Sequence, residues 1–188
     1  MKSQQMQKAV DKLKQDMQQA IKGATKVEVG ITDPAVAEYA TYVEFGWVQR
    51  VTPKQSLFFA GRGVSHPPKA GNSLVNPARP FFRGTIAQRA EHWNKLLKNY
   101  VKANGIDSLQ SGLMLAAQEA QADIVETITR GQVVGGGETF AERSNLTMEL
   151  YANESADKSK DGTGTVDTRK PLEKSGDLVR SIGWRFKT

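Results

Sequence analysis

Few side chains in this 188-residue sequence have the chemistry of a catalytic or metal-binding site. The chain contains no cysteine, which excludes disulfides, thiolate ligands and thiol nucleophiles, and only two histidines, His66 and His92. Glu119, Asp123 and Glu126 are spaced by four and three residues, but such an acidic row is more often a solvated helix face than a cation site. We therefore predict no catalytic residue, no metal ligand and no cofactor.

The glycine-rich stretch lacks the context of a phosphate-binding loop. Gly135, Gly136 and Gly137 follow a predicted helix, whereas loops that cradle phosphate lead from a strand into a helix N-terminus. The sequence has no P-loop, dinucleotide-binding, zinc-protease or serine-hydrolase motif. An enzyme is therefore the class of function that the sequence supports least.

Length and composition indicate one globular domain over residues 1–188. Hydrophobic residues make up 38% of the chain, somewhat below the usual globular share, and charged residues make up 24%, which is ordinary. No stretch approaches the roughly 18 apolar residues of a spanning helix, and the first residues lack the apolar segment of a secretory signal. We expect neither a membrane segment nor a classical secretory signal.

Charge is distributed in blocks along the chain. Residues 50–106 contain ten basic residues and one acidic residue, a net charge of +9, whereas residues 107–154 contain two basic and eight acidic residues, a net charge of −6. Blocks of opposite sign can steer a partner or a neighbouring copy of the chain, although each is more often the wet face of a helix. The pI of about 9.5 leaves nucleic-acid binding open, but the basic residues are dispersed and no RNA-binding or zinc-finger signature is present.

Hydrophobic periodicity predicts an α+β fold, in which a small, mostly antiparallel sheet packs against two long helices, with an additional N-terminal helix. The expected strands are 26–31, 55–60 and 183–187. The expected helices are the N-terminal helix within 1–23, then 34–45, 80–103, 107–130, 145–151 and 175–182. Stretches 61–76, 131–145 and 153–167 are expected as mobile loops. A single core is expected to contain Phe82, Trp93, Leu97, Leu113, Ile124 and Trp184.

Three further segments contain residues whose types favour particular helix starts and ends. They read YVEFG at 42–46, NPARPFFR at 76–83 and KPLEKSGDLVRSI at 170–182. Glycine permits an exit from a helix, proline disfavours helical conformation at the residue before it, and a serine between two leucines is typical of a capped helix start. The residues that we expect to define the fold here are Phe45, Gly46, Pro80, Phe81, Phe82, Leu172, Ser175, Gly176 and Leu178.

The order and spacing of these segments resemble the tail-completion or head–tail joining proteins of tailed bacteriophages. Those small α+β proteins carry a VEFG stretch, a PARPFxR stretch and a C-terminal KPLxxTGxLxxSI stretch. Here Ser175 stands in place of the common threonine, a mild change because either hydroxyl can cap a helix. The resemblance covers most of the chain from about residue 26, and the ordered triplet is more specific than any one motif.

The resemblance implies a structural virion protein without catalysis or cofactor. Copies would form a ring, a hexamer by family analogy, at the head-proximal end of the tail or at the neck. The partners would be the tail terminator, the tail-tube proteins and the head connector or stopper, with assembly in the host bacterial cytoplasm and DNA at most passing through the lumen. The alternatives are another phage morphogenesis factor or minor tail protein and, with less support, a basic nucleic-acid-binding module.

The charge blocks suggest how identical copies would meet. Basic side chains of one copy would face acidic side chains of the next, because head-to-tail contacts between copies can close into a ring. Arginine suits such contacts because its planar fork binds carboxylates at two points. The candidate interface residues are Glu44, Arg62, Arg79, Arg83, Arg89, Glu119, Asp123 and Glu126.

Overall fold

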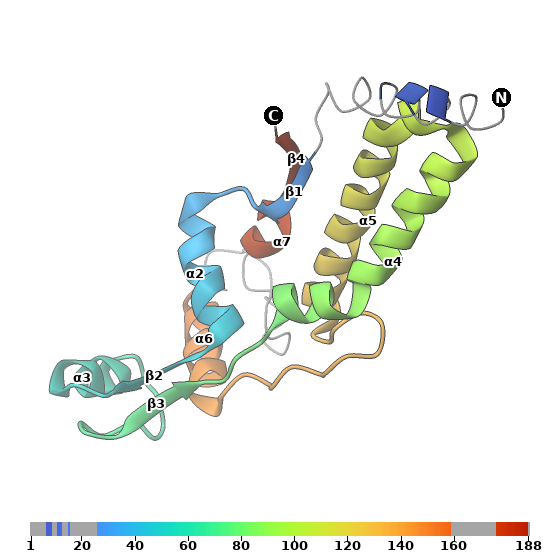
Figure 1. Ribbon diagram of the computed structural model, residues 1–188. Helices are drawn as coiled ribbons and strands as arrows, with labels where there is room; N and C mark the ends of the chain where they lie inside the picture. Colours follow the sequence, from blue (N-terminus) through green and yellow to red (C-terminus); the bar gives the residue numbers. More distant parts are fainter. Residues whose placement is uncertain (1–6, 9–10, 13–14, 16–25, 159–175, 188) are drawn as a thin grey trace.

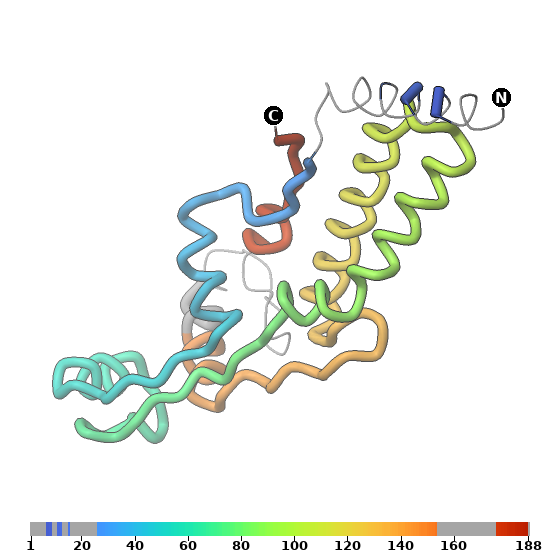
Figure 2. The backbone as a smooth tube through the Cα atoms, viewed as in Figure 1, coloured from blue at the N-terminus to red at the C-terminus, as the bar shows by residue number. Residues whose placement is uncertain are grey.

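The computed structural model describes residues 7–8, 11–12, 15, 26–158 and 176–187 (Figure 1 and Figure 2). The predicted N-terminal helix falls mostly outside these residues, although the described residues within it are helical. Leu172 and Ser175 also lie outside them.

The protein has an α+β fold, as the sequence predicts. Most of its regular secondary structure is helical, and its strands form two separate two-stranded antiparallel sheets rather than one sheet. In chain order the elements are β1 (Lys26–Ile31), α2 (Pro34–Phe45), β2 (Trp47–Arg50), α3 (Pro53–Gly61), β3 (Ser73–Asn76), α4 (Phe81–Asn104), a 3₁₀ turn (Ile106–Ser108), α5 (Leu109–Arg130), α6 (Asn145–Lys158), α7 (Asp177–Ser181) and β4 (Ile182–Lys187).

The first sheet joins two strands that are far apart in the sequence. β1 pairs antiparallel with β4, in a register that sets Lys26 opposite Lys187 and Ile31 opposite Ile182. Figure 1 shows this ladder between α2 and α5, and both of its strands contact α5. The predictions of strands at 26–31 and 183–187 are confirmed, with one more residue at the start of the second.

The two long helices form the predicted antiparallel hairpin. At Gly112 of α5 the side chain of Leu97 from α4 packs against the bare backbone, and an added Cβ would lie 2.9 Å from Leu97 Cδ1. Further along, Thr85 and Thr127 are fully buried and joined by a hydroxyl–hydroxyl hydrogen bond of 2.8 Å. Thr85 also donates to the Phe81 carbonyl, so the buried pair satisfies its polar atoms within the chain.

The main core lies where α2, α4, α5, α7 and the first sheet meet. Phe81 is 1% exposed and belongs to this core, whereas Phe82 is half-buried and packs against its edge. The prediction of one shared core is therefore wrong for most of its members: only Ile124 is fully buried there. Trp93, Leu97, Leu113 and Trp184 are half-buried outside it. The buried core residues are Ala40, Val43, Phe81, Ile124, Ile128, Val133, Phe140, Leu178 and Ile182.

The segment 47–76 forms an arm that extends from the lower end of α2 (Figure 1). β2 and β3 pair antiparallel along its length, and α3 lies at its outer end. The prediction of a strand at 55–60 is wrong because this stretch belongs to α3. Thr52 caps that helix in a capping box with Gln55, and Pro53 occupies the first helical position.

Two of the expected loops contain more structure than the sequence suggested. The stretch 61–76 includes β3. The helix α6 includes residues 153–158, so the first part of the loop expected at 153–167 is helical. The rest of that expected loop, 159–167, lies outside the described residues. The stretch 131–145 is anchored, because Val133 and Phe140 are buried in the core and Phe140 donates a backbone hydrogen bond to Gly131. Its glycines therefore form a fixed turn against α4 and α5.

Candidate functional site

The first two motifs meet at the start of α4. The backbone N–H groups of Phe82 and Arg83 donate hydrogen bonds of 2.9 and 3.1 Å to the two carboxylate oxygens of Glu44. Pro80, at the N-cap position, supplies no side-chain cap. Glu44 is buried and lies at the positive end of the α4 dipole, so a carboxylate 38 residues away in the sequence caps this helix.

Arg83 and Gly46 also take part in the contact between the first two motifs. Arg83 Nε lies 3.4 Å from Glu44 Oε1, and its guanidinium stacks over the Phe45 ring at 4.8 Å. Gly46 has a φ of 69°, and an added Cβ would lie 2.6 Å from the Asn76 carbonyl oxygen. The first motif therefore contacts the second directly through Glu44 and Gly46.

Arg79 connects the second motif to the segment before α6. Its guanidinium is buried and donates to the carbonyls of Ala141 and Glu142 and to the side-chain oxygen of Asn76, at 3.0, 3.1 and 2.9 Å. Burial lowers the pKa of Arg79 below its ordinary value. Because these hydrogen bonds lie within one chain, Arg79 holds the fold together here and is not presented to a neighbouring copy.

The third motif contributes to the same core. Leu178 is 2% exposed and lies in the core with Phe81. The helix α7 begins after Gly176, which has a φ of 72° and provides no side-chain cap. The prediction of a helix from 175 capped by Ser175 is therefore corrected: the N-cap position is Gly176, and the helix covers Asp177–Ser181.

Three of the candidate interface charges are gathered between α4 and α5 of one chain. Arg89 Nε lies 2.9 Å from Asp123 Oδ2, and a second nitrogen of Arg89 lies 3.7 Å from Glu119. Trp93 donates its indole N–H to the same Asp123 oxygen at 2.7 Å. Asp123 is 5% exposed, so this cluster links the two helices and offers little charge to a partner. The fourth acidic candidate, Glu126, is half-exposed and pairs with Arg130 on its own helix.

Arg62 lies on an exposed apolar surface at the end of the arm. It follows the last residue of α3 and lies over the Phe58 ring at 5.3 Å. Leu57 and Phe58 are 74% and 51% exposed, and α3 has no buried residue. We call Lys54, Leu57, Phe58 and Arg62 the arm tip. The arm tip therefore exposes two adjacent apolar side chains between two cations.

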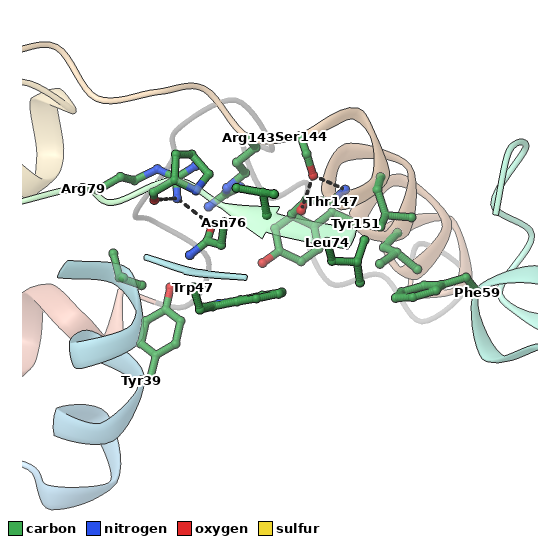
Figure 3. A pocket seen from close by; sticks show the side chains of 15 residues that line it. Tyr39, Trp47, Phe59, Leu74, Asn76, Arg79, Arg143, Ser144, Thr147 and Tyr151 are labelled. Carbon is green, nitrogen blue, oxygen red and sulfur yellow. Dashed lines mark hydrogen bonds between the residues drawn. The ribbon is translucent and has the colours of Figure 1, made fainter. Parts of the chain in front are cut away.

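A cavity of about 320 Å³ lies where the arm meets α2 and α6 (Figure 3). Trp47, Leu74 and Tyr151 are among its lining residues, with Arg79 and Arg143 toward one end. Arg79 already donates to main-chain carbonyls, and the Arg143 guanidinium lies over the Tyr151 ring. The cavity is therefore lined by both apolar and polar side chains, and its two arginines already contact other groups of the chain.

A second, shallower hollow of about 300 Å³ lies on α2 beside the start of α4. Ala37, Thr41 and Phe45 form one wall and Phe82 part of the other. We call this the α2 hollow. Sequence reasoning missed both the arm tip and this hollow, although the Thr52–Gln55 capping box and the absence of acidic residues from 47–76 are visible in the sequence.

Other kinds of site are not supported within the part of the chain that the structure describes. There, no three side chains of the histidine, aspartate and glutamate types gather to hold a metal ion, and no helix is long and apolar enough to span a membrane. No protein-family model matches the sequence, and neither the curated proteins nor the solved structures give a match.

Proposed function

We propose that the protein is a structural component of a tailed-bacteriophage particle. Copies form a ring at the head-proximal end of the tail or at the neck, and this ring joins the tail terminator and tail tube to the head connector. Assembly takes place in the host cytoplasm, and the finished ring is part of the virion. The proposal rests on the ordered triplet of motifs, which resembles tail-completion and head–tail joining proteins.

The observation that carries the proposal is the contact between these motifs. Glu44 of the first motif caps the helix that begins in the second, and Leu178 of the third is buried in the core with Phe81. Three segments that are scattered along the sequence therefore form one compact unit. Shared packing of this kind gives a physical reason for the three motifs to occur together in a protein family.

The distribution of exposed groups agrees with assembly rather than catalysis. The arm exposes apolar side chains on both its sheet and its helix, and such surfaces are usually covered by a partner. The proposed activity consists of recognising neighbouring subunits and requires neither a cofactor nor a membrane. The large apolar residues exposed on the arm are Trp47, Val48, Leu57, Phe58 and Val75.

The first test is the presence of the chain in purified particles. Mass spectrometry of gradient-purified virions should detect it in a ring-like copy number. A deletion strain should accumulate separate filled heads and tails, and a plasmid copy should restore joined particles. A deletion strain that forms fully joined, infectious particles would disprove the proposal. Absence from the particles, with defective assembly, would instead favour a morphogenesis factor that does not remain in the virion.

A nucleic-acid-binding module is the second candidate, and one observation favours it. Lys95, Lys98 and Lys102 recur at helical spacing on exposed positions of α4. Against this, Arg79 and Arg89 of the same basic block are engaged within the chain. A filter-binding titration with duplex DNA separates the two candidates: tight binding with a steep salt dependence supports the module, and no binding at low salt excludes it.

A further inference from the structure

The arm tip has the features of one half of an interface. Leu57 and Phe58 project from α3 with Lys54 and Arg62 on either side, at spacings that place all four near one face of the helix. The whole arm, 47–76, contains no aspartate or glutamate. The tip therefore combines apolar side chains with two cations, and neither cation forms an ion pair with a side chain that the structure describes.

The α2 hollow has the opposite character. Its walls are mostly apolar, α2 carries the exposed carboxylate of Glu38, and the exposed Asp33 caps the start of α2. Glu38 is three residues before Thr41, so the two lie on neighbouring positions of the helix surface. Arg83, the one cation on the rim, already pairs with Glu44. The surroundings of the hollow are thus negative overall, whereas the arm tip is positive.

The arm tip and the α2 hollow of one chain do not contact each other in the observed conformation. Leu57 remains 74% exposed, and α3 lies at the outer end of the arm, away from α4 (Figure 1). One chain therefore carries a basic apolar projection and a separate acidic apolar depression. Because the two lie at different places, a contact between them joins copies head to tail, and repetition of that contact generates a ring when the rotation closes.

We propose that the arm tip of one copy inserts into the α2 hollow of the next copy. This inference rests on the proposed ring and specifies its contact, with a second copy of the same chain as the occupant. Leu57 and Phe58 fill the hollow, while Lys54 and Arg62 approach Asp33 and Glu38. The apolar contact supplies most of the affinity, and the charges set the orientation and the association rate.

The absence of native cysteine allows a direct test by disulfide cross-linking. One variant carries Leu57→Cys, a second carries Thr41→Cys, and a third carries both. Under mild oxidation the equimolar mixture should give a covalent dimer that contains one copy of each single variant. The yield should be about tenfold or more above that of either single variant alone, because the contact converts the thiol encounter into an intramolecular one. The double variant should give a ladder of oligomers that ends at the closed ring.

Two controls separate this contact from random collision and from other geometries. Lys98→Cys on exposed α4 replaces Thr41→Cys and should give no more cross-linking with Leu57→Cys than the single variants show. A single variant that cross-links to itself as efficiently as the mixture would indicate a two-fold symmetric contact and overturn the proposal. So would the absence of a specific cross-link in purified protein at concentrations up to about 1 mM, where even contacts of millimolar Kd are populated.

A complementation experiment avoids cysteine chemistry. L57D/F58D disables the arm tip, and Glu38→Arg with Thr41→Arg disables the hollow. Each variant should fold but fail to self-associate. Their mixture should form a heterodimer, because one intact tip and one intact hollow remain. Restored association in sedimentation velocity supports the head-to-tail contact, and a mixture as monomeric as its components contradicts it.

The same cysteine variants, tested in phage particles, distinguish this inference from the proposed function. If particles contain the chain but show no cross-link between positions 57 and 41, the proposed function stands and the proposed contact is wrong. A cross-link from the arm tip to a different virion protein would also contradict the contact. A specific cross-link in the purified protein, together with a deletion strain that assembles normally, would retain the contact and reject the phage function.

Discussion

The Glu44 carboxylate accepts the backbone N–H of Phe82 at 2.9 Å, so the end of α2 provides the cap for the start of α4. The adjacent N–H of Arg83 donates to the other carboxylate oxygen at 3.1 Å. Most helices are capped by a side chain a few residues away, whereas this cap comes from a different helix. Formation of α4 and its docking on α2 are therefore energetically linked.

Loss of this cap should destabilise the protein. Glu44→Ala should lower the free energy of unfolding by about 2–3 kcal/mol, because two partly buried N–H groups lose a charged acceptor. Glu44→Gln keeps one acceptor oxygen and should cost roughly half as much. Urea denaturation followed by circular dichroism measures both, and Glu38→Ala on the exposed side of α2 should change the free energy by no more than about 0.5 kcal/mol. Equal losses for Glu44→Ala and Glu38→Ala would contradict the capping role.

The two adjacent phenylalanines of the second motif should differ in their contribution to stability. Phe81→Ala should cost about 3–5 kcal/mol because the ring is fully buried, whereas Phe82→Ala should cost less than half as much because its ring is half-buried at the core edge. Each variant is the control for the other, since composition and position in the helix are nearly the same. A larger loss for Phe82→Ala would mean that α4 is rotated from the orientation described above.

Charge reversal at Asp123 should affect folding before it affects assembly. Asp123→Lys sets a second cation against Arg89 in a buried position and removes the acceptor of the Trp93 indole, so we expect a loss of about 3–5 kcal/mol. Glu126→Lys, at an exposed pair on the same helix, should cost about 0–1 kcal/mol. Thermal melts of the two variants provide the comparison. If Asp123→Lys melts like the parent, the cluster between α4 and α5 is not structural.

The sheet β1–β4 should lose stability in acid through Glu28. Hydrogen bonds from Lys187 and Arg185 across the ladder lower the pKa of the Glu28 carboxyl below its ordinary value of 4.5. A lowered folded-state pKa means that the stabilisation is present above pH 4.5 and is lost as the pH falls through the folded-state pKa. Denaturation at pH 7 and pH 3 should therefore show a smaller acid loss for Glu28→Gln than for the parent. Lys187→Ala should likewise reduce the acid loss, and an unchanged loss in both variants would contradict this.

Local sequence signals predicted the elements that depend on local chemistry. The helix α2 starts at Pro34 as expected, and the carboxylate of Asp33 before it accepts the Ala35 N–H. The alternation in 26–31 and 183–187 and the long apolar stripes of α4 and α5 also gave the correct elements. Each of these features is carried by residues within a few positions of one another.

The errors arose where competing local signals or distant contacts decide the structure. The apolar run at 56–60 favoured a strand, but the capping box at Thr52 and Gln55 starts a helix that contains it. The predicted core included Phe82 from the start of α4, whereas the structure buries the neighbouring Phe81 instead. The net charge of a block cannot show that Arg89 and Asp123 already neutralise each other, because that pairing exists only once α4 packs on α5.

The pairing of β1 with β4 has a consequence for the order of events during synthesis. Lys26 opposes Lys187, so the ladder closes a loop that contains nearly the whole described fold. A nascent chain holds β1 without its partner until residues 182–187 have left the ribosome. Contacts of such high sequence separation slow folding and leave an unpaired strand edge exposed meanwhile. Emergence of residues 182–187, rather than formation of the α4–α5 hairpin, therefore sets the earliest time at which this ladder can close.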